Sequence, residues 1–156
     1  GLPDHVRERL ASPLMQRALN TSVPAWLARF GALFVGNRTM EAVLKEIIYD
    51  HTLVTPAVLD RSNRNRQRED MITPLMSLRD SLPLWEQHFA PRLKEIRHPT
   101  LILWGEQDRL FPPQVGRDLQ TTIPQARLIM IPEAGHIPQW EQPQVVNRHI
   151  TEFLQP

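Results

Sequence analysis

The stretch that decides the fold runs from Thr100 to Asp108 and reads TLILWGEQD. It opens with a mainly apolar run of strand length, which a proline precedes and a glycine follows. A second such run, ARLIMI, covers Ala126–Ile131 between two prolines. Continuous rather than alternating hydrophobicity is typical of strands that are covered on both faces, as in a parallel sheet between helices. The two runs therefore predict neighbouring strands of an α/β fold.

Helical patterns separate and follow these strands. Pro113–Thr122 predicts a crossover helix, and Pro143–Leu154 predicts a final helix. The residues predicted to face inward from this last helix are Val145, Val146, Ile150, Phe153 and Leu154. We therefore expect a right-handed β-α-β unit with a closing helix. Because two strands are too few for an independent sheet of this kind, we expect either a preceding segment of the same gene product or a second copy of the chain beside them.

Helical spacing dominates the earlier part of the chain. Apolar residues in Met40–Ile48 recur at helical intervals, and Trp26–Phe34 carries a similar stripe. Thr55 followed by Pro56 is a good helix start, because it offers a hydroxyl N-cap and a proline at the first helical position. The boundary between the helical part and the strand-containing part is expected near Arg97–Pro99.

Composition limits the classes of partner. The 156 residues are 41% hydrophobic, which suits a globular core, and their formal net charge is +1. With charges of both signs interspersed, we expect no nucleic-acid or membrane-surface partner. No apolar stretch approaches the roughly 20 residues that span a bilayer. The absence of cysteine excludes disulfides and is compatible with a reducing compartment, so a cytoplasmic location is expected.

Two titratable side chains follow the predicted strands. Asp108 comes shortly after the first strand, and His136 comes shortly after the second. The carboxyl ends of parallel strands meet at one edge of a sheet, where ligands of open α/β sheets bind. We therefore expect the two side chains to lie close enough to touch. In acyl transfer, a histidine takes the proton of a nucleophile while a carboxylate orients the imidazole.

Both loops resemble one known family. Residues 103–112 (LWGEQDRLFP) resemble the acid loop of the α/β-hydrolase superfamily, and residues 131–143 (IPEAGHIPQWEQP) are similar to its histidine loop. The resemblance implies an incomplete α/β-hydrolase fold. A helical cap or lid, residues 1–96, would be followed by the C-terminal β-α-β-α part of the parallel-sheet core, residues 97–156.

The resemblance also implies roles for individual residues. Asp108 would be the acid of a catalytic triad, and His136 would be its general base. Gly105 and Gly135 would permit tight turns at which the backbone approaches the site.

A weaker resemblance concerns the substrate. Ile47–Thr55 resembles the cap of hydrolases that cleave carbon–carbon bonds in ring-opened aromatic products. Trp140, close to His136 in sequence, and Ile137, where those enzymes usually carry an aromatic residue, are predicted to bind substrate. The expected substrate is a small apolar or ester-like molecule. The bond that is hydrolysed is expected to be either an ester bond or a carbon–carbon bond.

The remaining histidines are scattered without a metal-ligand spacing. They are His5, His51, His88, His98 and His149. We therefore expect neither a metal nor a cofactor.

The nucleophile of such a triad precedes the acid in sequence, yet no Gly-x-Ser-x-Gly occurs in the chain. The oxyanion hole, whose donors lie near the nucleophile, is missing with it. Serines occur only in helical or turn sequence, at Ser12, Ser22, Ser62, Ser77 and Ser81. We interpret the chain as the C-terminal portion of a serine hydrolase, inactive alone, that associates with its missing half or with itself. The alternative hypothesis is a non-catalytic module that binds a ligand or protein through its helical face.

Overall fold

The computed structural model describes residues 11–13, 16, 36–66 and 72–155. In it η1 and η3 are 3₁₀-helices and η2 is a short π-helix. The elements are, in chain order, α4 (Asn37–Ile47), η1 (His51–Leu53), α5 (Pro56–Arg66), α6 (Ile72–Leu84), η2 (Trp85–Phe89), η3 (Ala90–Glu95), β1 (Thr100–Gly105), α7 (Pro113–Thr122), β2 (Ala126–Ile131), α8 (Pro138–Glu141) and α9 (Pro143–Leu154).

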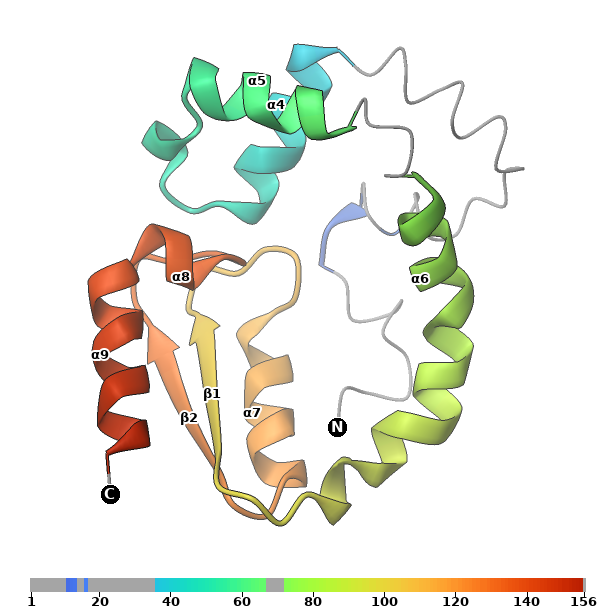
Figure 1. Ribbon diagram of the computed structural model, residues 1–156, viewed down its shortest axis with the longest axis vertical. Helices are drawn as coiled ribbons and strands as arrows, with labels where there is room; N and C mark the ends of the chain where they lie inside the picture. The colour runs from blue at the N-terminus through green and yellow to red at the C-terminus, as the bar shows by residue number, and fades with distance from the viewer. Residues whose placement is uncertain (1–10, 14–15, 17–35, 67–71, 156) are drawn as a thin grey trace.

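The described sheet consists of β1 and β2 in parallel, joined through α7. The register pairs Thr100 with Ala126 and Gly105 with Ile131, so both strands end at the same level. Helices α7 and α9 lie on opposite sides of the strand pair (Figure 1). The predicted order of strand, helix, strand and helix is confirmed, and α7 and α9 begin and end at the predicted residues. The α/β fold class is confirmed with it.

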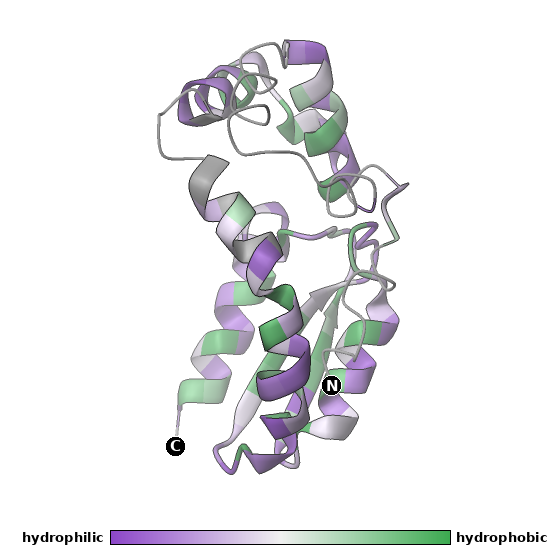
Figure 2. Ribbon diagram, turned by 90° about the vertical axis from the view of Figure 1, so that its right-hand side faces the viewer, coloured by the Kyte–Doolittle hydropathy of each residue, from purple (hydrophilic) through white to green (hydrophobic). Residues whose placement is uncertain are grey.

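One buried cluster of this unit lies between the strands and α9. Ile131, Ala134 and Val146 are buried there, and half-buried side chains of β1, β2 and α9 pack against them. Figure 2 shows apolar colour along the strands, whereas α7 and α9 carry both apolar and polar residues. The strands are continuously hydrophobic, and the helices beside them are amphipathic. Both features are typical of a sheet that is covered on both faces.

The prediction for the inner face of α9 is wrong at two positions. Val146 is buried, and Val145 and Phe153 are half-buried, but Ile150 is 39% exposed and Leu154 is 73% exposed. The described sheet has two strands, and neighbouring strands lie only about 5 Å apart. It is too narrow to cover the whole apolar face of the helix.

Helices α4 and α5 lie beyond the carboxyl ends of the two strands (Figure 1). The predicted start of α5 is confirmed: Pro56 is its first residue, and the amide of Val58 donates to Thr55 Oγ1 over 3.3 Å. The stripe of Met40–Ile48 lies in α4 except for its last residue. That residue, Ile48, directly follows the helix and is buried. The stripe of Trp26–Phe34 lies outside the described residues.

Two glycines let the loops after the strands approach other backbone closely. A Cβ on Gly105 would lie 2.0 Å from the carbonyl oxygen of Gly135 and 2.4 Å from that of Ala134. A Cβ on Gly135 would lie 2.7 Å from the carbonyl oxygen of Ile47. Neither glycine has a positive φ; among the described residues that conformation belongs to Glu133, at 52°. Both positions therefore require glycine for space and not for its unusual dihedral angles.

A Gly105→Ala substitution tests this constraint. We expect it to lower the free energy of unfolding by about 3 kcal/mol or more, because the new Cβ meets rigid backbone oxygens. Urea unfolding followed by circular dichroism measures the change. Gly36→Ala is the matched control, since nothing lies within 4 Å of a Cβ at that position, and its expected effect is about 1 kcal/mol or less. Equal stability of the two variants would contradict the close-approach argument.

Candidate active site

The site is built from two loops that leave the ends of the paired strands. We call residues 105–111 the acid loop and residues 132–137 the histidine loop. The ladder continues past the strands, because the amide of Glu106 donates to the carbonyl of Ile131 over 3.0 Å. Gln107 then joins the loops twice: its amide donates to the carbonyl of Ala134 over 3.0 Å, and its Oε1 accepts from the amide of Ala134 over 3.1 Å. The two loops are thus fixed side by side.

Asp108 is a buried carboxylate that backbone amides hold in place. It is 7% exposed. Its Oδ1 accepts from the amide of Leu110 over 2.8 Å and from the amide of Phe111 over 3.0 Å. The Nε1–H of Trp104 donates to the carbonyl of Phe111 over 3.3 Å and so anchors the far end of the loop. These bonds fix the carboxylate with Oδ2 directed at the histidine loop.

His136 meets that free oxygen. Its Nδ1 lies 3.0 Å from Asp108 Oδ2, and its side chain is 34% exposed. The ring of Phe111 lies 5.7 Å from the imidazole between centroids, at an interplanar angle of 40°. A carboxylate can only accept, so Nδ1 is the protonated nitrogen in the neutral ring and Nε2 carries the free lone pair. The arrangement supplies an oriented base at the edge of the sheet.

The other two predicted site residues lie on the chain that follows. Ile137 is half-buried and precedes α8, and Trp140 lies in α8 with 38% of its surface exposed. The amide of Trp140 donates to the carbonyl of Ile137 over 2.9 Å. The structure places both residues near His136 along the chain.

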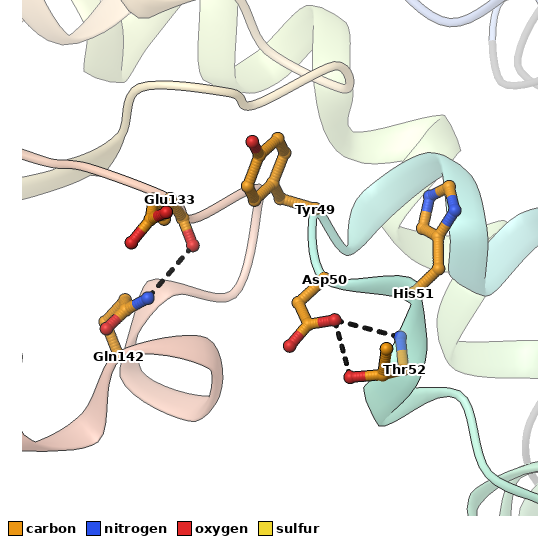
Figure 3. A pocket seen from close by; sticks show the side chains of 6 residues that line it. All are labelled: Tyr49, Asp50, His51, Thr52, Glu133 and Gln142. Carbon is orange, nitrogen blue, oxygen red and sulfur yellow. Dashed lines mark hydrogen bonds between the residues drawn. The ribbon is translucent and has the colours of Figure 1, made fainter.

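A pocket of about 340 Å³ lies between the end of α4 and the histidine loop. Figure 3 shows the side chains that line it: Tyr49, Asp50, His51, Thr52, Glu133 and Gln142. None of the four predicted site residues belongs to this set. The Thr52 hydroxyl, donating over 2.6 Å, and then the Thr52 amide hold the pKa of Asp50 below its usual value. The pocket is therefore polar and carries an ionised carboxylate on one wall.

Sequence reasoning missed two side chains that shape the site. Gln107 joins the two loops, and Glu141 accepts from backbone amides on both the histidine loop and the turn after α4. Both residues stand in the stretches that resemble the family's loops. Their residue types gave no indication of these roles, because each role consists of hydrogen bonds to backbone that is distant in sequence.

Two kinds of feature are absent from the part of the chain that the structure describes. No group of three His, Asp or Glu side chains there is placed to hold a metal ion. None of its helices combines the length and the hydrophobicity that a membrane span needs.

A family model described as the alpha/beta hydrolase fold matches residues 12–143. The chain belongs to the α/β-hydrolase fold family. Among its relatives in this family, the 2-hydroxy-6-oxononadienedioate/2-hydroxy-6-oxononatrienedioate hydrolase of Comamonas testosteroni is 32% identical over 117 residues, which cover 74% of this chain and 41% of that enzyme. The 2-hydroxy-6-oxo-6-phenylhexa-2,4-dienoate hydrolase of Burkholderia cepacia gives the same identity and coverage. The chain thus spans less than half the length of these α/β-hydrolases.

Solved structures of the family support the same fold. The meta-cleavage product hydrolase of Pseudomonas fluorescens IP01 superposes with a TM-score of 0.62 at 24% identity, over 76% of this chain and 45% of that one. The 2-hydroxy-6-oxo-6-phenylhexa-2,4-dienoate hydrolase of Rhodococcus sp. strain RHA1 gives a TM-score of 0.57 at 20% identity, over 88% of this chain and 51% of that one. At these identities the likeness concerns the α/β-hydrolase fold alone.

An Asp108→Asn substitution tests the orientation of His136. The amides of Leu110 and Phe111 would hold the amide oxygen of the new side chain, so its NH₂ would face Nδ1 and donate to it. We expect the ring proton to move to Nε2, which ¹⁵N chemical shifts of the His136 ring detect. Asp118→Asn is the matched control, since Asp118 Oδ1 accepts from Gln114 in α7. A ring that stays protonated at Nδ1 in Asp108→Asn would contradict the assignment.

Proposed function

We propose that this chain supplies the acid and the base of a Ser-His-Asp triad in a hydrolase of the α/β-hydrolase family. Asp108 is the acid, His136 is the general base, and the serine lies on a segment outside these 156 residues. No Gly-x-Ser-x-Gly occurs in the chain, and the acid precedes the histidine in the order that the family uses.

The observation that carries the proposal is the 3.0 Å contact between Asp108 Oδ2 and His136 Nδ1. The carboxylate fixes the tautomer, so Nε2 is free to take the proton of a serine hydroxyl. The imidazolium that forms is then stabilised by the same carboxylate, whose second oxygen two amides already satisfy. A buried, fully hydrogen-bonded acid beside a partly exposed imidazole is the arrangement that this step needs.

For the substrate we propose a ring-opened aromatic product of the 2-hydroxy-6-oxo-dienoate class, cleaved at a carbon–carbon bond. The names of the curated relatives support this class, as does the resemblance of Ile47–Thr55 to the cap of such enzymes. Trp140 and Ile137 are proposed to contact the apolar part of the substrate. Hydrolysis of esters is the competing proposal for the same triad.

The division of the chain follows from the same proposal. Residues 1–96 form the cap over the site, and residues 97–156 form the C-terminal part of the core. The position of α4 and α5 beyond the strand ends supports this division (Figure 1). We propose further that the chain alone is inactive, and that a missing segment or a second copy of the chain pairs with its sheet.

The test combines a fluorophosphonate serine probe with intact masses of every polypeptide in the purified sample. We expect the probe to label a companion, or a longer species that contains this sequence, and not the 18.1 kDa chain. The labelled species should hydrolyse 2-hydroxy-6-oxo-6-phenylhexa-2,4-dienoate faster than a simple aryl ester. Asp108→Asn in that species should reduce kcat by about 10³–10⁴-fold, because the imidazole adopts the wrong tautomer. Asp118→Asn should leave kcat unchanged.

Three outcomes would overturn the proposal. Esterase turnover by the pure 156-residue chain would show that its nucleophile lies inside the chain. Full turnover in Asp108→Asn, or binding of a ligand or protein with no labelled species at all, would favour a non-catalytic module derived from a hydrolase.

A further inference from the structure

Glu141, the last residue of α8, accepts hydrogen bonds from two segments that are far apart in sequence. Its Oε1 accepts from the amide of Gly135 in the histidine loop over 2.7 Å. Its Oε2 accepts from the amides of Tyr49 and Asp50, just after α4, over 2.6 and 3.2 Å. One carboxylate therefore joins the residue before His136 to the turn at the end of α4.

A second bond joins the same segments without Glu141. The amide of His136 itself donates to the carbonyl of Ile47 over 2.7 Å. The space between the segments is tight, because a Cβ on Gly135 would lie 2.7 Å from that carbonyl oxygen and 3.0 Å from the amide nitrogen of Tyr49. The backbone that carries His136 is thus held directly against the Ile47–Asp50 turn.

The three hydrogen bonds that Glu141 accepts require a carboxylate at this position. All three amides are donors, and an ionised carboxylate offers acceptors on both oxygens. Among the described residues, no ion pair includes Glu141. Its carboxylate instead accepts hydrogen bonds from these three amides. A glutamine would offer one acceptor oxygen and would direct NH₂ protons at the remaining amide protons.

We propose that Glu141 is a positioning residue for His136, and that through it the orientation of the imidazole depends on the placement of α4. This inference rests on the proposed function, in which His136 is the base. Asp108 is held by separate bonds, from the amides of Leu110 and Phe111. Loss of Glu141 should therefore disturb the histidine side of the pair and leave the acid side in place.

The experiment compares Glu141→Gln with the unsubstituted protein by NMR and uses no activity assay. Exchange of the Tyr49 and Gly135 amide protons should become about tenfold to hundredfold faster, the range for losing a hydrogen bond to a charged acceptor. Exchange at Leu110 and Phe111 should stay unchanged. The ¹⁵N shifts of the His136 ring should move away from the Nδ1-protonated form toward a mixture of tautomers, because contact with Asp108 becomes intermittent.

Glu133→Gln is the matched control, since it removes one carboxylate charge from the nearby histidine loop, whereas the acceptor of these amides is Glu141. It should reproduce the unsubstituted spectra. If Glu141→Gln does not fold, Glu141→Asp keeps the charge but withdraws the oxygens by one methylene, and it should show the same changes to a smaller extent.

A folded variant at Glu141 with unchanged His136 ring shifts would overturn the proposal and leave Glu141 a purely structural residue. The failure of the proposed function gives a different result. In that case the ring of the unsubstituted protein would not be protonated at Nδ1, or Asp108→Asn would leave catalysis intact.

Discussion

The arrangement of this site depends on one close contact between two backbones. The histidine loop crosses directly over Gly105, where no side chain would fit. The crossing is possible because β1 and β2 are parallel and end at the same level, so that the loops leave the sheet side by side. Gln107 then fixes the crossing with two hydrogen bonds to Ala134. This contact therefore sets how closely the acid loop and the histidine loop approach each other.

Burial of Asp108 is compensated by hydrogen bonds and not by a cation. Two amides occupy one of its oxygens, and the imidazole of His136 occupies the other. Among the described residues, no lysine or arginine forms an ion pair with it. A buried carboxylate without its donors would be strongly destabilising, so the turn that supplies the amides and the histidine that supplies the third donor are required together. Asp108 and His136 are therefore parts of one hydrogen-bonded unit.

The helical layer takes part in this unit. The end of α4 and the turn that follows it make three hydrogen bonds here: the carbonyl of Ile47 accepts from the amide of His136, and the amides of Tyr49 and Asp50 donate to Glu141. One of these bonds joins main chain to main chain, and the other two depend on the Glu141 carboxylate. These bonds link the placement of α4 to the backbone that carries His136.

The sequence by itself determined the α/β class, the bounds of α7 and α9, and the placement of Asp108 and His136 after neighbouring strands. Those features follow from local hydrophobic patterns and from the rule that parallel strands end at one edge. Only the tertiary structure decided why Gly105 and Gly135 are glycines, what Gln107 and Glu141 bind, and which part of the α9 face is covered. These depend on contacts between backbone segments that are distant in sequence, and the amides and carbonyls that make them are the same for nearly every residue type.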